Sequence, residues 1–523
     1  MKMRQPFSAF RLIAAFAAVV CSVVHAASVP PVGGAHGMVV TAHQLATKVG
    51  VDVLKSGGNA VDAAVAVGYA MAVVYPAAGN LGGGGFMTIQ FADGRKTFLD
   101  FREKAPLAAT RDMYLDSTGN VIKGASTKGH LAVGVPGSVA GLEYAREKYG
   151  TRSRSTLIAP AITYAERGFV LDDGDIALFV TANDDFRDDA ATAAIFLNHG
   201  QPYKAGNRLV QKDLAKTLRL IAQRGPDVFY RGSIADAIAA SSDAGKGIIT
   251  KADLAQYKVR ELAPIECDYR GYQYLGDPDF VKNPLDRLLD KAYAAKIRAA
   301  IDPAKAGISR DMKPGVEPHE GNNTTHYSIV DSQGNAVSVT YTLNDWFGAK
   351  VTAAKTGILL NDEMDDFTAK LGVPNLYGLV QGEANSITPG KRPLSSMSPT
   401  IVSRDGKPVM VIGTPGGSRI ITVVVHCILN VVDYGMNIQE AIDAPRFHQQ
   451  WLPETTNVEI FALSPDTRKI LVEMGHKLGD PQPPGHAAGI LVGAPSLGGK
   501  PLGTDRFYGA NDPRRGTGLA LGY

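Results

Sequence analysis

Hydrophobic and polar positions before residue 310 switch between helical and strand-like patterns. Apolar residues recur at helical spacing over residues 41–54, and Asn59 is a favourable N-cap for the almost wholly apolar stretch that follows it. Because that stretch is apolar on every side, we expect a helix buried all round. The patterns predict helices at 41–54, 60–74 and over most of 156–255, and strands at 86–91, 97–101 and 256–273.

After residue 310 the pattern changes to a polar linker and then a β-hairpin. Residues 310–323 are polar and contain two prolines, whereas residues 325–331 and 336–342 alternate around a Ser-Gln-Gly-Asn turn. Antiparallel pairing about this turn places Thr324 opposite Thr342, to within about one or two positions. Facing threonines also occur in ordinary hairpins, so the pairing alone assigns no chemistry.

Two other stretches have a distinct texture. Four consecutive glycines at 82–85 lead into a strand and are not followed by Gly-Lys-Ser/Thr, so we interpret them as a tight passage of backbone and not as a phosphate-binding loop. Residues 408–412 are expected to form a strand. Residues 418–432 are apolar enough for either a buried helix or a buried strand.

The first residues predict a processing signal. Three basic residues precede an apolar run at 12–24, which is too short to span a bilayer, and Val24-His25-Ala26 offers a cleavage site. A buried N-terminal helix is the alternative. Removing residues 1–26 would leave 51 basic and 51 acidic residues, a balance that favours neither nucleic acid nor an anionic membrane. We expect export without a membrane anchor, most simply to a bacterial periplasm.

The cysteines do not indicate a metal centre. Cys267 and Cys427 would remain after removal of the signal, and export permits a disulfide between them without requiring one. Cys427 lies in an apolar stretch, where a buried thiol is typical. Neither residue has metal-ligand spacing and no His-Glu-x-x-His motif occurs, so we expect no metal and no organic cofactor.

Five motifs appear in order along the second half of the chain. They are Asn323-Thr324-Thr325-His326-Tyr327-Ser328, Met364-Asp365-Asp366-Phe367, Pro393-Leu394-Ser395-Ser396-Met397-Ser398-Pro399-Thr400, Pro415-Gly416-Gly417-Ser418-Arg419-Ile420 and Pro445-Arg446-Phe447-His448. Together they resemble the gamma-glutamyltranspeptidase family of the N-terminal nucleophile hydrolase superfamily. The resemblance extends from about Gly37 to Tyr523.

The resemblance implies a catalytic group built around Thr324. The chain would cut itself before Thr324, and the new α-amine would serve as the base for the threonine hydroxyl, which is a weak nucleophile alone. An α-amine has a pKa near 8, so it can be neutral at working pH. Thr342 would orient the nucleophile. Gly416 and Gly417 would donate two backbone N–H groups to the oxyanion.

The resemblance also implies a pocket for the zwitterionic end of a γ-glutamyl group. Arg102 would bind the α-carboxylate, as a guanidinium can do with two hydrogen bonds. Residues 372–382, with Tyr377, resemble a lid over the site that would exclude water. The other implied substrate-binding residues are Ser395 and Ser396 as hydroxyl donors, and Asn344, Glu363 and Asp366 around the α-amino group.

The implied fold is an α+β, four-layer αββα sandwich. Residues 27–323 and 324–523 would be the large and small subunits of an intertwined heterodimer made from one precursor. The implied reaction transfers the γ-glutamyl group of glutathione or a related amide to water, an amino acid or a dipeptide. No nucleic-acid partner is expected.

The chain departs from the family pattern at Tyr274. Family members carry several dozen more residues here, with a proline-rich turn and a long helical stretch, whereas this chain joins the flanking segments directly. The loss would remove helices that cover a sheet and expose apolar surface. Maturation needs tight geometry, so the hypothesis follows that the shortened chain fails to cut itself.

Three other functions stay open on the sequence. A cephalosporin or glutaryl acylase and a poly-γ-glutamate depolymerase lie in the same superfamily, although Arg102 and the lid favour a free glutamyl α-carboxylate. The third is an inactive secreted protein that retains the ligand pocket, for which the missing segment is the support.

Overall fold

The computed structural model describes residues 28–269, 272–276, 290–309, 323–376, 382–450, 454–479 and 485–523. Two compact units are distinguished, Met1–Pro30 and Pro31–Tyr523, and the fold below is that of the second. The expected signal peptide, the linker at 310–322 and Tyr377 lie outside the described residues. Within the described residues, no helix combines the length and the apolar character needed to cross a bilayer.

Two antiparallel sheets form the centre of the Pro31–Tyr523 unit. In spatial order, the first contains β20 (Leu519–Gly522), β2 (Met38–Thr41), β10 (Asn323–Val330), β11 (Ala336–Asn344), β3 (Gly84–Gln90), β4 (Lys96–Asp100) and β7 (Arg260–Leu262). The second contains β1 (Val32–Gly34), β19 (Phe507–Asn511), β18 (Ala488–Val492), β15 (Lys407–Gly413), β14 (Thr400–Arg404), β9 (Tyr272–Gly276) and β8 (Ile265–Tyr269). Apolar residues of β2, β15 and β18 pack between the sheets.

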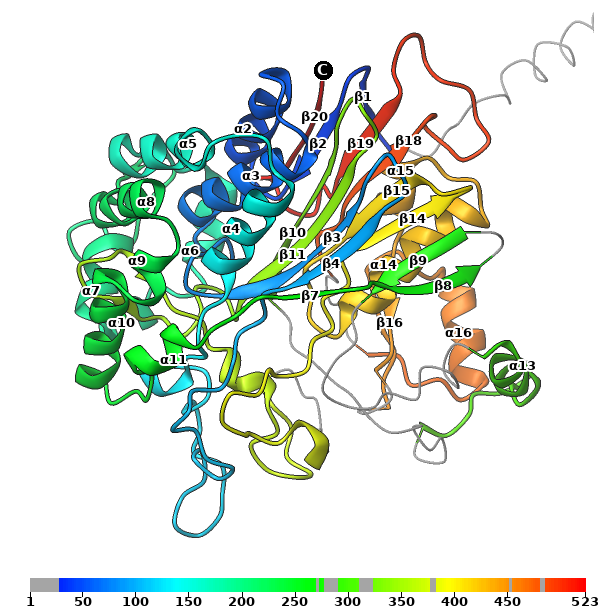
Figure 1. Ribbon diagram of the computed structural model, residues 1–523. Helices are drawn as coiled ribbons and strands as arrows, with labels where there is room; N and C mark the ends of the chain where they lie inside the picture. The colour runs from blue at the N-terminus through cyan, green and yellow to red at the C-terminus, as the bar shows by residue number, and fades with distance from the viewer. Residues whose placement is uncertain are drawn as a thin grey trace, which may run out of the picture. The chain divides into compact units, whose positions relative to one another are not determined.

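Helices cover the outer faces of both sheets (Figure 1). Those beside the first sheet are α2 (Gln44–Lys55), α3 (Ala60–Val74), α4 (Ser138–Tyr149), α5 (Arg154–Arg167), α6 (Asp173–Phe179), α7 (Ala190–Phe196), α8 (Lys212–Arg224), α9 (Asp227–Tyr230), α10 (Ser233–Ala244) and α11 (Lys251–Ala255). On the other side lie α13 (Lys291–Ala299), α14 (Arg419–Val432), α15 (Ile438–Asp443) and α16 (Pro465–Glu473). Short strand pairs join β5 (Phe169–Val170) to β6 (Arg208–Leu209), β12 (Thr352–Ala353) to β13 (Ile358–Leu359), and β16 (Phe447–His448) to β17 (Asn457–Val458).

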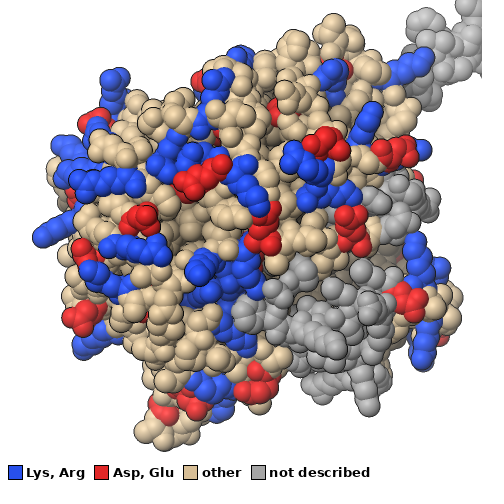
Figure 2. Space-filling view, in the orientation of Figure 1, with Lys and Arg blue, Asp and Glu red and all other residues tan. Residues whose placement is uncertain are grey.

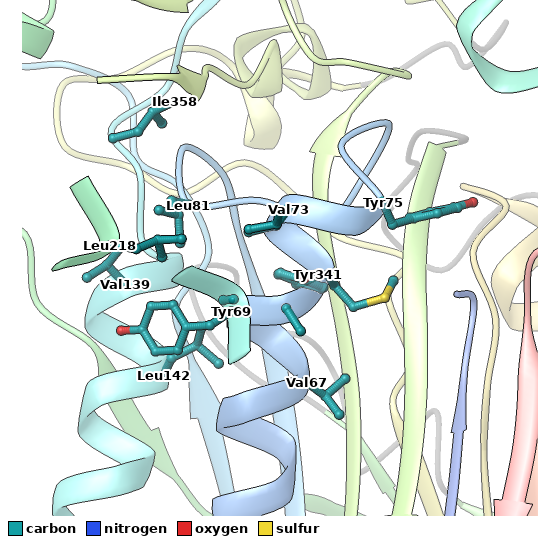
Figure 3. Close-up of a cluster of buried hydrophobic side chains, with 14 of the residues drawn as sticks. Val67, Tyr69, Val73, Tyr75, Leu81, Val139, Leu142, Leu218, Tyr341 and Ile358 are labelled. Atoms are coloured by element: carbon teal, nitrogen blue, oxygen red, sulfur yellow. The ribbon is translucent and has the colours of Figure 1, made fainter. Parts of the chain in front are cut away.

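Helix α3 is the buried helix that the sequence predicts. Every one of its residues is buried, and Asn59 caps it in a reciprocal capping box with Asp62. Figure 3 shows its side chains in the same apolar cluster as Tyr341 of β11. The hydroxyls of Tyr327 and Tyr341 donate to carbonyls of α3 at 3.1 Å each. The helix layer is therefore pinned directly to β10 and β11.

The glycine run is the tight backbone passage that the sequence indicates. A Cβ on Gly83 would lie 2.0 Å from the carbonyl oxygen of Thr342, a distance that no side chain tolerates. Asn80 donates to the same carbonyl at 2.8 Å and accepts from the Gly83 N–H at 3.0 Å. Only glycine lets β3 approach the end of β11 this closely.

Residues 419–432 form a helix, which resolves the alternative that the sequence left open. One face of α14 packs on the second sheet and includes Val424 and Cys427, which are buried. Burial raises the pKa of the Cys427 thiol to about 11. Cys267 lies on the exposed part of β8, and no disulfide joins the two cysteines.

The described helices over the second sheet leave part of their apolar surface exposed. Helices α13 and α16 contain no buried residue. On α14, Ile421 and Val425 are 52% and 45% exposed. Apolar surface of this kind normally marks a place where another element packs.

Replacing Ile421 and Val425 together by serine should reduce aggregation without weakening the fold. About half of each residue is exposed. We therefore expect the free energy of unfolding to change by less than about 0.5 kcal/mol per site, while light scattering and dye binding to apolar surface decrease. The matched control is Val424→Ser, a buried neighbour on the same helix, which should cost roughly 2 kcal/mol or more. Equal losses in all variants would show that the exposed face is packed.

Candidate active site

The β10–β11 hairpin brings two threonine hydroxyls together. Thr324 pairs with Thr342 in the register that the sequence predicts, and an irregularity of the ladder falls between Asn323 and Thr324. The Thr324 Oγ1 lies 3.5 Å from the Thr342 Oγ1, which itself accepts the Asn344 N–H at 2.8 Å. Both threonines are buried. The nucleophile candidate therefore starts a central strand with its hydroxyl already directed at a partner.

His326, two residues after Thr324, connects β10 to the second sheet. Its Nδ1 lies 2.8 Å from the Thr340 hydroxyl and its Nε2 lies 3.0 Å from the Ser328 hydroxyl. Burial lowers the pKa of His326 to about 3, so the ring is neutral. A Cβ on Gly413 would lie 2.3 Å from this ring. Sequence reasoning placed His326 in the Asn323–Ser328 motif but did not predict these contacts.

Gly416 and Gly417 lie in the loop between β15 and α14. Both have positive φ, 138° and 57°, which favours glycine. Their carbonyls accept the N–H groups of Arg419 and Ile420 at 3.2 and 2.8 Å, whereas their own N–H groups donate no hydrogen bond within the described residues. Two unused donors at the start of a helix suit a developing negative charge.

A buried polar network supports this loop from behind. The Thr414 hydroxyl donates to the Pro415 carbonyl at 2.7 Å and accepts the His486 N–H at 2.9 Å. Asp512 forms an ion pair with Arg446 at 2.8 Å. Despite the burial of Asp512, the positive charge of Arg446 holds its pKa down, at about 2. Arg446 belongs to a motif that the sequence singled out without assigning a role.

Arg102 lies buried at the centre of a cluster of carboxylates. Its guanidinium donates to Glu363 and Asp366, both on the 3₁₀ turn Glu363–Asp366, and to the Leu394 carbonyl at 2.8 Å. Glu103 lies 3.8 Å away. These residues come from distant parts of the sequence. The fold thus assembles the predicted cation and the predicted acidic residues into one group.

Glu103 is a member of this cluster that the sequence reasoning missed. It is fully buried, and burial raises its pKa to about 7 although Arg102 opposes the shift. Burial likewise raises the pKa of Glu363, and the negative charge of Glu103 adds to that effect. The position of Glu103 directly after Arg102 in the sequence could have predicted that its carboxyl belongs to the same site.

The other predicted substrate-binding residues adjoin this group to different degrees. The Asn344 amide, on a residue with φ of 77°, donates to the Asp362 carbonyl at 3.1 Å. The hydroxyl of Ser395 accepts the Met397 N–H at 3.3 Å, and Ser396 is buried. Their segment is tied to Arg102 through the neighbouring Leu394 carbonyl. Among the described residues, no group of three His, Cys, Asp or Glu side chains is placed to hold a metal ion.

Comparisons with known proteins point to one family. A family model for gamma-glutamyltranspeptidase matches residues 46–274 and 272–522. The chain is 67% identical to the glutathione hydrolase proenzyme of Pseudomonas sp. (strain A14), with 96% of each chain covered. The chain belongs to the gamma-glutamyltranspeptidase family. It is also 47% identical to the glutathione hydrolase proenzyme of Escherichia coli (strain K12), over 94% of this chain and 93% of that one.

Solved structures agree with the four-layer sandwich. The cephalosporin acylase from Bacillus halodurans matches with a TM-score of 0.81 at 25% identity, over 96% of this chain and 98% of that one. The gamma-glutamyltranspeptidase of Helicobacter pylori matches with a TM-score of 0.51 at 40% identity, over 52% of this chain and 94% of that one. The predicted N-terminal nucleophile hydrolase fold is confirmed.

The match to the transpeptidase family model also supports the inference that a segment is missing near Tyr274. It matches in two pieces that meet at residues 272–274. The alignment with the Pseudomonas proenzyme spans 554 residues, more than the 523 of this chain. Relatives therefore carry residues that this chain lacks, and the break falls at the position expected from the sequence.

The raised pKa of Glu103 predicts a pH-dependent stability. A native pKa near 7 lies above the ordinary glutamate value, so the protonated carboxyl stabilises the fold at low pH and this contribution is lost as the pH rises through 7. Glu103→Gln should therefore reduce the loss of unfolding free energy between about pH 5 and pH 8, by roughly 2–3 kcal/mol. Urea unfolding at both pH values measures it.

The matched control for this measurement is Glu147→Gln, because Glu147 is exposed. That variant should follow the parent at both pH values. If Glu103→Gln also follows the parent, Glu103 is ionised in the native protein across this range.

Proposed function

We propose that this protein is a γ-glutamyltransferase and glutathione hydrolase that matures by cutting itself before Thr324. Residues 27–323 and 324–523 would be its two subunits. The observation that carries the proposal is the pairing of Thr324 with Thr342 at the start of a central strand, directly after a polar linker. Near-complete coverage by glutathione hydrolase proenzymes supports it.

Maturation would begin at the Thr324 hydroxyl. Its oxygen attacks the Asn323 carbonyl carbon, the Thr324 nitrogen leaves and takes up a proton, and an ester joins the two residues. Water then hydrolyses the ester, which gives a carboxylate on Asn323 and a free α-amine on Thr324. Thr342, 3.5 Å from the nucleophile, orients the hydroxyl. The ladder irregularity between Asn323 and Thr324 leaves this peptide outside regular pairing.

Turnover would use the same oxygen with a new base. The free amine of Thr324 accepts the hydroxyl proton while the oxygen attacks the γ-carbonyl carbon of the donor. The N–H groups of Gly416 and Gly417 stabilise the oxyanion, because they are otherwise unused. The amine of the donor's leaving group departs with the proton that the Thr324 α-amine had accepted, and a γ-glutamyl ester remains on Thr324. In the second half-reaction, water or the amine of an amino acid attacks this ester and releases the γ-glutamyl group.

Donor recognition would rely on the charges around Arg102. In the structure its guanidinium is neutralised by Glu363 and Asp366. The substrate brings one carboxylate and one ammonium, so Arg102 can turn to the carboxylate while the acidic residues and Asn344 receive the ammonium. The exchange leaves the charge of the buried site unchanged, which limits the cost of desolvation. Ser395, Ser396 and a lid with Tyr377 complete the proposed pocket.

Localisation is part of the proposal. A basic start, a short apolar run and a cleavage motif in residues 1–26 support export, most simply to a bacterial periplasm. Amino acids and dipeptides are the proposed acceptors.

An acylase is the second candidate because of specific similarities. The cephalosporin acylase of Bacillus halodurans shares the fold at a TM-score of 0.81, and the acylase ACY 1 proenzyme of Pseudomonas sp. (strain SE83) is 34% identical over 86% of this chain. Hydrolysis of a glutaryl anilide in preference to a γ-glutamyl anilide would favour it.

Intact mass and N-terminal sequencing of the purified protein test the proposal. We expect two fragments, the smaller starting at Thr324, and hydrolysis of a γ-glutamyl anilide. Thr324→Ala should remain a single chain without activity, because it lacks the nucleophile. Thr325→Ala, at the next position of the same strand, is the control and should still be cut before Thr324.

A single uncut parent chain would overturn self-cleavage in this shortened protein. Binding of glutathione without turnover would then identify it as an inactive ligand-binding protein.

Replacing Arg102 by lysine should weaken donor binding more than it slows chemistry. Lysine keeps the charge but loses the planar pair of donors, so KM for a γ-glutamyl anilide should rise at least ~10-fold with a smaller fall in kcat. Arg95→Lys, at an exposed arginine, is the control. A loss confined to kcat would place Arg102 outside the binding of the α-carboxylate.

A further inference from the structure

Basic residues gather around a single buried carboxylate beside Arg102. The basic patch consists of Lys104, Lys258, Arg260 and Arg392, and the carboxylate is Asp100. Arg260 and Arg392 form ion pairs with Asp100, the latter at 3.2 Å. Arg392 also donates to the Lys258 carbonyl at 2.8 Å, which fixes its orientation. Figure 2 shows Lys and Arg side chains concentrated near the middle of one face.

Lys104 differs from the two arginines of the basic patch. It is partly buried and has no ion pair or side-chain hydrogen bond within the described residues. Its ammonium lies 6.0 Å from the centre of the Tyr257 ring. Burial lowers its pKa to about 8, and the positive charges of Arg392 and Arg260 act in the same direction against the pull of Asp100. A cation held in this setting gains from an anion.

The basic patch adjoins the proposed donor pocket through covalent and hydrogen-bonded links. Lys104 follows Arg102 by two residues, and the Tyr257 hydroxyl donates to the Arg102 carbonyl at 2.9 Å. The Arg392 guanidinium lies 5.7 Å from the centre of the same Tyr257 ring. Two residues after Arg392, the Leu394 carbonyl accepts from Arg102. Tyr257 therefore contacts the Arg102 backbone through its hydroxyl and lies near the cations of Lys104 and Arg392 through its ring.

Stabilisation of the fold explains the two arginines of the basic patch but not its two lysines. Arg260 and Arg392 clamp Asp100 and thereby join β4, β7 and the segment before Ser395. Lys104 and Lys258 add two positive charges that this clamp does not need. The charges that act on Lys104 do not neutralise it, because Arg392, Arg260 and Lys258 are also cations and Asp100 is already paired with the two arginines.

We propose that the basic patch, through Lys104, binds a second carboxylate of the substrate, one that lies outside the transferred γ-glutamyl group. This inference rests on the proposed function. The carboxylate can belong to the leaving group of the donor, as the C-terminal carboxylate of glutathione does, or to a peptide acceptor. The protein would thus favour substrates with an anionic far end over those with a neutral one.

The test compares substrates that differ in one carboxylate. For the donor, kcat/KM for hydrolysis of glutathione is compared with that of its C-terminal amide. For the acceptor, transfer from a γ-glutamyl anilide to glycylglycine is compared with transfer to glycylglycine amide. We expect the carboxylate form to be preferred by roughly 5-fold or more in either the donor or the acceptor comparison, and the comparison that shows it identifies which substrate carries the bound carboxylate. The preference should decline as the salt concentration rises.

Variants attribute the preference to the basic patch. Lys104→Gln should bring the ratio of carboxylate to amide substrate close to one, whereas Lys104→Arg should retain it. Lys500→Gln, at an exposed lysine, is the control and should leave the ratio as in the parent. An unchanged ratio in Lys104→Gln, or no preference in either arm of the parent, would overturn the inference. Loss of anilide hydrolysis in the parent would instead count against the proposed function.

A binding measurement keeps the inference testable if the chain does not cut itself. In uncut Thr324→Ala, the rate at which an amine-reactive ester labels Lys104 is followed by mass spectrometry. Glutathione should slow this labelling and its C-terminal amide should not, because only the former has the second carboxylate. Equal protection by both, or protection by neither, would overturn the inference.

Discussion

Antiparallel pairing of β10 with β11 is the constraint on which the site depends. The two strands lie at the centre of the first sheet, between β2 and β3. A slip of one residue in either strand would turn its threonine to the opposite face of the sheet and separate the hydroxyls of Thr324 and Thr342. Tyr327 and Tyr341 hold the hairpin against α3, and Asn80 holds the Thr342 carbonyl. Reactive geometry thus follows from packing on both sides of two strands.

The second constraint is the charge inside the protein. Arg102 is buried with Glu103, Glu363 and Asp366, and charges in such surroundings remain only if they have partners. The group consists of one cation and several acidic side chains, and burial raises the pKa of Glu103, so this carboxyl takes up a proton more readily than in water. The proposed recognition of a zwitterionic donor is consistent with this requirement, because a ligand with both charges can replace internal ion pairs one for one.

Local patterns predicted much of the fold and one half of the site. The register of the hairpin followed from strand alternation about a short turn, and the limits of α3 followed from Asn59 and a run of small apolar residues. The contact of Arg102 with Glu363 could not follow from the residues alone, because it joins positions 261 apart in the chain. Resemblance supplied the roles that local chemistry did not. The apolar run at 419–432 was compatible with either a buried helix or a buried strand, and in the structure it packs on the second sheet as a helix.

The order of strands in the two sheets affects whether the cleaved protein can refold after it is denatured. In the first sheet, β10 and β11 lie between β2 and β3, which both precede Thr324, and in the second sheet β15 and β14 lie between β18, which follows Thr324, and β9, which precedes it. A cut before Thr324 would break one peptide bond but no ladder, so the two pieces would stay threaded through each other. Once unfolded and separated, they would have to rebuild both sheets from two chains instead of one. Assembly would then be a single event in the history of each molecule, and heat damage after maturation would be permanent.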